Sequence, residues 1–362
     1  MKILMKKLFM KSVLLSFVLI LLGCSAEVRD KLTPTPNAMG KVNEIIVIAD
    51  KSLWEGPVGD SIQYYLSSAY LILPQPEPIF DLRHFTPEDL SEVPIRKNFR
   101  SYLFIGNLNN NTSEASNMIK QDLGPEKVRR AKEDKNFNIS IGHNKWANPQ
   151  LLIYQFGFSD DDIIANIKKN YKAIAQKVHE NDEPYVEANI YQVGSNFKIN
   201  EKVKQEFNAQ INIPDDYVLA MHDSLTNTLW LRKETDFLSS NIFIHKRKYT
   251  DQKQLSKEGI KELRNDLGKY VSTEIENTYM YVNDVDLPMF LKTMQIDNRY
   301  TVEARGIWEI ENDYMGGPFI SYTIHDPEAN ELLYLDGFIH APGKEKRNYM
   351  QQLEKIFTSA KL

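Results

Sequence analysis

Cys24, the only cysteine of the chain, is the residue whose context most clearly specifies a chemical modification. It follows a basic segment with four lysines, an apolar run over residues 12–22, and then Gly23. The apolar run has roughly half of the ~20 residues that a helix needs to span a bilayer, which is typical of a cleaved signal peptide. The pattern predicts cleavage before Cys24 and acylation of its thiol, which would attach the mature chain to a membrane.

Three acids near the first predicted strand are candidates for carboxylate chemistry. Asp50 ends that strand, and Glu55 and Asp60 follow on the way into the next helix. A pair of carboxylates can hydrolyse a glycosidic bond when they face each other at about 5–5.5 Å or about 6.5–9.5 Å. Each acid also has a structural interpretation, as a turn, capping or surface residue, and we favour that interpretation.

Two glycine-bearing segments are candidate contacts for a ligand or partner. The first leads into a helix, whose free backbone N–H groups can receive an anion. The second lies between two predicted strands, where glycine allows a partner to approach the backbone. Local packing and turn formation are the alternative interpretation for both. The candidate residues are Trp54, Gly56, Gly59, Gly316, Gly317 and Phe319.

Other familiar catalytic and metal-binding patterns are absent from the sequence. It contains neither Gly-x-Ser-x-Gly nor His-Glu-x-x-His, and its seven histidines have no spacing that predicts a metal site. Because Cys24 is the only cysteine, no disulfide or further thiol nucleophile is available. We therefore expect no metal and no cofactor.

The charge balance argues against a nucleic-acid partner. The chain has 44 basic and 49 acidic residues, a net charge of −5. Removing residues 1–23 takes away four lysines and no acids, so the mature chain has a net charge of −9. Nucleic-acid binding requires a basic face, whereas mild acidity is common in envelope proteins.

Composition divides the chain into four parts: a signal peptide over 1–23, a proline-bearing tether over 24–40, and two globular regions over 41–184 and 185–362. The tether contains Thr33-Pro34-Thr35-Pro36, which favours extended backbone. The mature length is sufficient for two hydrophobic cores.

The first globular region alternates strands with helices. The apolar run Glu44–Ala49 predicts a buried strand, and Thr86 before Pro87 predicts the start of a short helix. A long helix capped from Ser159 is expected to end near His179, ahead of Pro184. Further strands are predicted over 79–82, 102–105, 139–141 and 151–156, with helices from Pro57 and over 113–133. This alternation predicts an α+β region with ferredoxin-like packing.

The second region repeats one order of elements. Strands over 217–221, 228–232 and 241–248 precede a helix over 254–270, and strands over 301–311, 318–325 and 332–340 precede a helix over 344–357. Three strands and a helix, twice over, predict an antiparallel or mixed sheet covered by helices. This meander-plus-helix pattern is similar to that of PsbP-like proteins.

The chain resembles a family of Bacteroidetes lipoproteins characterised only as a domain of unknown function. The likeness is carried by the lipobox, by residues 53–60 (Leu-Trp-Glu-Gly-Pro-Val-Gly-Asp), by residues 73–78 (Leu-Pro-Gln-Pro-Glu-Pro) with Phe80-Asp81-Leu82, and by residues 316–319. The resemblance implies a lipid-anchored location outside the cytoplasm. It implies no activity and no catalytic residue.

These observations favour a non-catalytic envelope lipoprotein that binds a partner or maintains the envelope. Its expected partners are the membrane, through Cys24, and an envelope protein, and its expected location is the outer membrane facing the periplasm. Two alternatives remain open. One is an envelope glycan or peptide hydrolase using the paired carboxylates, and the other is a periplasmic lipid carrier.

Overall fold

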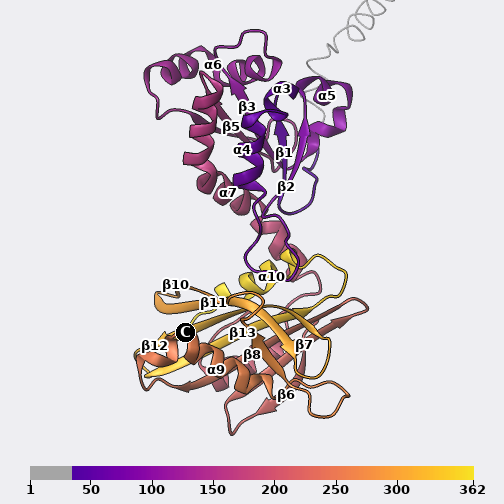
Figure 1. Cartoon of the computed structure of the whole chain (residues 1–362), viewed down its shortest axis with the longest axis vertical. Helices are drawn as coiled ribbons and strands as arrows, with labels where there is room; N and C mark the ends of the chain where they lie inside the picture. Colours follow the sequence, from indigo (N-terminus) through magenta and orange to yellow (C-terminus); the bar gives the residue numbers. More distant parts are fainter. Residues whose placement is uncertain (1–34) are drawn as a thin grey trace, which may run out of the picture.

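The computed structural model describes residues 35–362, which form two domains joined by a long helix (Figure 1). The first domain runs from strand β1 (Glu44–Ile48) to helix α7 (Asp160–Ile190), and the second from helix α8 (Phe197–Phe207) to helix α10 (Arg347–Thr358). The predicted α+β class, with two regions and mixed and antiparallel sheets, is confirmed. Within the described residues, no helix has both the length and the apolar character needed to cross a bilayer.

The first domain is built on a five-stranded sheet in the order β2-β1-β3-β5-β4. Strands β1, β2 (Asp81–Phe85), β3 (Ser101–Asn107) and β5 (Leu151–Gly157) are parallel, and β4 (Ile139–His143) pairs antiparallel with β5. The expected ferredoxin-like packing of this region is wrong, because its strands are mostly parallel and joined by crossovers. The order is that of a doubly wound sheet with one antiparallel edge.

Helices cover both faces of this sheet, which explains why its central strands are apolar throughout. Consecutive residues of β1, such as Ile45 and Ile46, point to opposite faces. One face packs against α3 (Lys51–Trp54), α4 (Pro57–Leu66) and α7, and the other against α5 (Pro87–Glu92) and α6 (Glu114–Glu133). A short 3₁₀ helix, η1 (Pro94–Asn98), follows α5.

Two predicted helix boundaries have different outcomes. The hydroxyl of Thr86 accepts a hydrogen bond from the backbone N–H of Asp89 and completes a capping box at α5, as its sequence predicts. The predicted end of α7 near His179 is wrong, because the helix continues through Pro184 to Ile190. Val178 packs in the first core and Ile190 in the second, so burial at both ends outweighs the ~3 kcal/mol cost of an internal proline.

The second domain is an antiparallel sheet in the order β10-β11-β12-β13-β8-β7-β6, with β9 also paired to β11. The predicted meander followed by a helix occurs twice. The first set is β6 (Val218–Asp223), β7 (Thr228–Thr235), β8 (Leu238–Lys248), the 3₁₀ turn η2 (Gln252–Leu255) and α9 (Lys257–Gly268). The second set is β11 (Arg299–Ile310), β12 (Gly316–Asp326), β13 (Glu331–His340) and α10. It is preceded by two strands that were not predicted, β9 (Met280–Asn283) and β10 (Phe290–Ile296).

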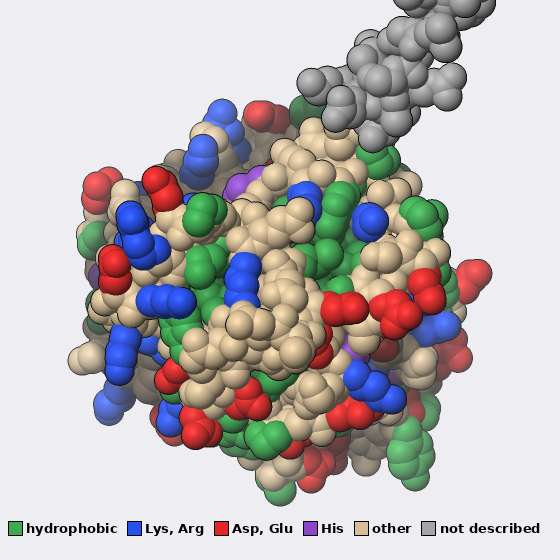
Figure 2. All heavy atoms as spheres, turned by 90° about the horizontal axis from the view of Figure 1, so that it is seen from above, with side chains coloured by type: hydrophobic (Ala, Val, Ile, Leu, Met, Phe, Trp, Pro, Cys, Tyr) green, Lys and Arg blue, Asp and Glu red, His purple; other side chains and the backbone are tan. Residues whose placement is uncertain are grey.

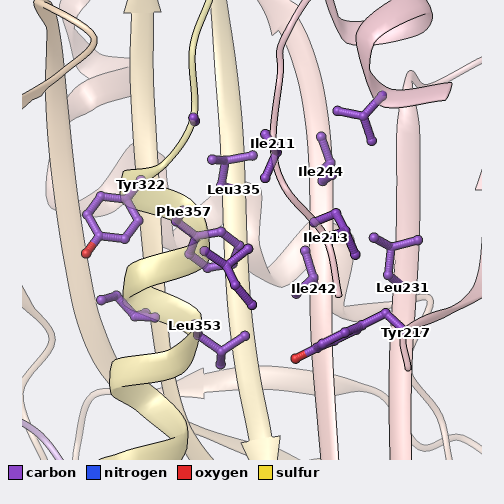
Figure 3. Packing of buried hydrophobic residues seen from close by; sticks show 14 of the residues in the cluster. Ile211, Ile213, Tyr217, Leu231, Ile242, Ile244, Tyr322, Leu335, Leu353 and Phe357 are labelled. Atoms are coloured by element: carbon purple, nitrogen blue, oxygen red, sulfur yellow. The ribbon is translucent and has the colours of Figure 1, made fainter. Parts of the chain in front are cut away.

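Helices α8 and α10 pack on one face of this sheet, and α9 on the other. Figure 3 shows Leu353 and Phe357 of α10 directed at Tyr322 and Leu335 of the sheet. Sheet strands β8 and β13 lie at the centre, where side chains are buried on both faces. The sheet is therefore the middle layer of a three-layer domain.

His245 on β8 gives the stability of this domain a pH dependence. Its side chain is 9 % exposed, its Nδ1 lies 2.9 Å from the hydroxyl of Thr228, and burial lowers its pKa from 6.5 to about 4. Between about pH 4 and pH 6.5, His245 is therefore mostly neutral in the folded chain and mostly protonated in the unfolded chain. The stabilisation is complete above the unfolded pKa of 6.5 and is lost as the pH falls towards 4, a loss of roughly 3 kcal/mol.

We expect His245→Gln to remove most of this pH dependence. Urea unfolding at about pH 7 and about pH 4 measures it, and the wild type should lose roughly 3 kcal/mol more than the variant between the two. Equal losses in both proteins would show that His245 is not the responsible group.

Candidate functional site

The segment over residues 67–80, between α4 and β2, extends from the first domain and contacts the second. We call it the interdomain loop. Its Leu73 is 5 % exposed and packs in the core beneath α10. Its Glu77 accepts hydrogen bonds from the backbone N–H groups of Lys346 (2.6 Å) and Arg347 (2.8 Å) at the start of α10. A carboxylate at a helix N-terminus satisfies free donors and complements the helix dipole. The two domains are therefore interlocked and not merely adjacent.

A buried polar cluster forms a second connection between the domains. Arg100 Nε donates to Asp182 Oδ1 at 2.7 Å, and the backbone N–H of Asn43 donates to Asp182 Oδ2 at 2.6 Å. The amide of Asn43 then donates to Asn348 (3.0 Å) and Gln351 (2.7 Å) of α10. Burial raises the pKa of Asp182, whereas Arg100 and the Asn43 N–H oppose that rise by favouring its carboxylate form.

A cleft with a volume of about 920 Å³ lies between the domains beside these contacts. The first domain contributes aromatic walls, in which Tyr65 and Tyr171 stack with ring centroids 4.8 Å apart. Phe80 packs against the His179 ring, also at 4.8 Å. The second domain contributes Phe290 and Leu291 of β10, along with charged residues of β11 and α10.

Arg305 on β11 organises the charged part of the cleft. Its guanidinium donates to Glu303 (2.7 Å), to Glu354 of α10 (2.8 Å) and to the hydroxyl of Tyr70 in the interdomain loop (2.8 Å). The Tyr70 hydroxyl donates in turn to Glu354 at 3.3 Å, and burial raises the pKa of Tyr70. These contacts fix the side chains from two domains in one geometry.

The lowered pKa of Glu303 indicates that this network favours the charged form of the Glu303 carboxylate. Burial alone would raise that pKa, but hydrogen bonding and charge from Arg305, with smaller contributions from Tyr322 and Lys292, bring it below its ordinary value. A general acid for glycoside hydrolysis requires a raised pKa. Glu303 is therefore suited to holding charge and not to donating a proton. The cleft combines aromatic walls with a fixed, hydrogen-bonded floor, which is the composition of a binding site.

The three acids predicted from sequence lie away from this cleft. Asn43 precedes β1 and lines the cleft, whereas Asp50 follows β1 at the other end of the strand. The Asp50 carboxylate accepts hydrogen bonds from the hydroxyl of Ser113 and the backbone N–H of Ala115 (3.1 Å) at the start of α6.

Glu55 and Asp60 are both exposed to solvent on the first domain. Glu55 forms an ion pair with Lys51 at 3.6 Å, and Asp60 lies in the first turn of α4. No hydrogen bond or ion pair joins Asp50, Glu55 and Asp60 to one another. Their catalytic role stays a prediction.

The first glycine-bearing segment packs against its own domain. Trp54 stacks on His84 with centroids 4.9 Å apart and planes 7° apart. Gly56 is the N-cap of α4, and a Cβ at Gly59 would lie 1.8 Å from the carbonyl oxygen of Trp54. Only glycine allows α4 to approach α3 this closely.

The second glycine-bearing segment lies within β12 and not in the turn before it. Gly316 pairs with Glu309 of β11, and a Cβ at Gly317 would lie 2.0 Å from the carbonyl oxygen of Ile339. Phe319 is 0 % exposed and lies beneath the guanidinium of Arg264 at 3.8 Å. None of the six candidate contact residues lines the cleft.

Sequence reasoning did not select Tyr70, Glu303, Arg305 or Glu354. Glu303 and Arg305 are two residues apart on one strand and so share a face, which is a visible but common signal. Tyr70 is 235 residues from Arg305, and no local pattern connects them. Cys24 lies outside the described residues. Within residues 35–362, no group of three or more His, Cys, Asp or Glu side chains is arranged to hold a metal ion.

Outside the cleft, the end of the first domain remote from the second has mixed surface chemistry. Figure 2 looks onto this end and shows basic and acidic side chains interspersed, with apolar patches between them. Opposite charges that alternate over a surface leave little long-range potential of either sign. The interdomain cleft is the stronger candidate site.

Two family models of unknown function match the chain, one on each domain. Residues 38–190 match Domain of unknown function (DUF8532), and residues 196–359 match Domain of unknown function (DUF4837). No curated protein matches the chain. The likeness to domains of unknown function is thereby confirmed, and it assigns no activity to the cleft.

Proposed function

We propose that this protein is a non-catalytic binding protein of the cell envelope, attached to the membrane through a lipidated Cys24. Its function on this proposal is to hold a ligand or a protein partner in the interdomain cleft. The proposed location is the outer membrane, facing the periplasm. We also propose that the chain is related to a family of Bacteroidetes lipoproteins.

The observation that carries this proposal is the construction of the cleft. Aromatic side chains of the first domain and strand β10 of the second line the same cleft, whose volume is about 920 Å³. Arg305 holds Glu303 and Glu354 in place within it. Sites for ligands occur preferentially at domain interfaces and combine apolar walls with a few fixed polar groups. The lipid-carrier alternative required a cavity between a sheet and its own helices, whereas this cleft lies between two domains.

A photoreactive residue in the cleft is expected to capture the occupant in living cells. We propose p-benzoylphenylalanine in place of Tyr171, which lines the cleft, with the same residue in place of Tyr314 as the matched control. Tyr314 is fully exposed and does not line the cleft. The expected result is a crosslinked species identified by mass spectrometry from the Tyr171 position alone. Capture from neither position, or equally from both, would contradict a function located in the cleft.

Cys24→Ala is expected to release the protein from the membrane fraction. A doubly or triply acylated cysteine gains about 0.8 kcal/mol per buried CH₂ group, enough for stable attachment. Fractionation, together with metabolic labelling by a clickable palmitate analogue, measures the effect. Label incorporation or membrane association that survives Cys24→Ala would refute lipid anchoring at this residue while leaving the cleft proposal standing.

A further inference from the structure

Strand β10 is the last strand of the second sheet, and within residues 35–362 no strand pairs with its outer edge. It pairs with β11 over seven consecutive residues, from Phe290 with Arg305 to Ile296 with Arg299, without a register shift. Most of its side chains are exposed, which sets it apart from the buried strands at the centre of the sheet. Figure 1 places β10 at the rim of the second domain that faces the first.

The register shows which backbone groups of β10 are free. Asp297 and Asn298 form a two-residue turn with φ of 49° and 60°, so the flanking Ile296 and Arg299 exchange both hydrogen bonds. Hydrogen-bonded and outward-facing residues then alternate along the strand. The backbone N–H and C=O groups of Leu291, Thr293 and Gln295 therefore point away from β11. Within residues 35–362, no backbone hydrogen bond reaches these three residues.

This edge lacks the devices that usually prevent strand addition, which are proline, charge and bulges. The opposite edge strand, β6, has a register shift between Leu219 and Met221. By contrast, β10 contains no proline, and its one charged residue, Lys292, stands directly opposite Glu303 on β11. That charge is directed into the cleft network and leaves the outward backbone accessible.

The open edge is continuous with the cleft. Phe290 and Leu291, at the first end of β10, line the cleft, and they are 47 % and 37 % exposed. A strand added along β10 would satisfy the outward groups of Leu291, Thr293 and Gln295. Its side chains would alternate between faces, so one of them would reach the aromatic walls.

We infer that β10 binds an extended segment of a partner polypeptide as an added strand, with an apolar side chain of that segment in the cleft. This rests on the proposed function and names the class of occupant. A second copy of this chain is a poorer occupant. Two-fold pairing centred on Thr293 would place the polar turn Asp297–Asn298 of the copy beside the aromatic end of the cleft.

The test uses the full-length protein in detergent and a random dodecapeptide display library. Enriched peptides are then synthesised and their affinities measured for the wild type and three sets of variants. Thr293→Pro removes one outward N–H and no bond to β11, and Gln295→Pro does the same nearer the turn. Thr293→Val keeps the N–H and is the matched control. Ala175→Trp adds bulk to the cleft from α7 and leaves the sequence of β10 unchanged.

We expect enriched peptides to lose about tenfold or more in affinity for both proline variants and for Ala175→Trp, and to bind Thr293→Val as they bind the wild type. Amide exchange of Leu291, Thr293 and Gln295 should slow when the peptide is bound. Circular dichroism and thermal unfolding verify that each variant folds.

Three outcomes would overturn the inference. Peptides that bind both proline variants with wild-type affinity but fail with Ala175→Trp would leave the cleft proposal standing and remove the edge. A dimer that Thr293→Pro dissociates would assign the edge to a second copy. A library that enriches no peptide would exclude a polypeptide occupant, while the crosslink from Tyr171 would still decide whether the cleft has another ligand.

Discussion

Replacing Arg264 by methionine is expected to lower the free energy of unfolding by about 3–5 kcal/mol, because it would leave a carboxylate buried without its partner. Arg264 on α9 donates from Nε to Asp336 Oδ1 on β13 at 3.0 Å, and both side chains are 1 % exposed. The guanidinium also lies 3.8 Å from the ring centroid of Phe319. Burial raises the pKa of Asp336 although Arg264 opposes it, so the carboxylate depends on Arg264 for its charge.

The double variant Arg264→Met with Asp336→Leu is expected to recover most of the lost stability, since an apolar pair of similar volume needs no desolvation of charge. Lys269→Ala is the surface control. Its ion pair with Asp266 is 69 % exposed on both sides and is screened by water, so this variant should be about as stable as the wild type. Urea unfolding monitored by circular dichroism measures all three. A loss below about 1 kcal/mol for Arg264→Met would contradict this account.

The local elements of the first domain could be predicted because their signals lie within a few residues. Strand β1 is a continuous apolar run, Thr86 and Asp89 form a complete capping box, and the pair β4–β5 reads as a hairpin. The order of the parallel strands could not be predicted. Parallel pairing is decided here by contacts between residues 37 to 56 positions apart, from Glu44 with Asp81 to Ile46 with Tyr102, and helices on both faces exclude the ferredoxin-like arrangement.

Three elements of the second domain were missed, β9, β10 and α8, and the last two were missed for different reasons. Strand β10 gives no alternation of apolar and polar residues, because its residues from Phe290 to Gln295 are largely exposed. Helix α8 did have a signal: Asn196 caps it, and Ile199, Val203 and Phe207 recur every four residues on its buried face. Strand β10 was missed because its exposed residues give no strand pattern, whereas the pattern of α8 was present in the sequence and was not recognised.

The candidate site was the least predictable part, because it is made by tertiary contacts. Glu303 and Arg305 come from a strand, Glu354 from the last helix, and Tyr70 from a loop near the start of the chain. Some of the residues selected from sequence have local structural roles: Asp50 accepts a hydrogen bond from the Ala115 N–H at the start of α6, and Gly59 allows α3 and α4 to pack closely. The residues selected from sequence were recognised by their local pattern, and none of those within residues 35–362 lines the cleft between the domains.

Asp182→Ala is expected to lower the free energy of unfolding by about 3–5 kcal/mol and to loosen the packing of the two domains around the cleft. The variant would leave Arg100, which is 4 % exposed and lies 3.9 Å from the ring centroid of Tyr185, without its counter-charge. It would also remove the acceptor of the Asn43 N–H, directly before β1. Because Asn43 and Asp182 line the cleft and Asn43 contacts α10, the junction between the domains should loosen.

Glu180→Ala is the matched control, since Glu180 lies two residues earlier on the same helix and lines the same cleft. Its ion pair with Lys177 is about half exposed (46 % and 49 %) and is screened by water, so the control should lose little stability. Asp182→Asn separates charge from shape, because asparagine keeps an acceptor but leaves Arg100 uncompensated. We expect it to fall between the other two in urea unfolding. If Asp182→Ala proved as stable as Glu180→Ala, the buried cluster would not be what joins the domains. The interdomain loop, through Leu73 and Glu77, would then have to hold the cleft in its observed geometry.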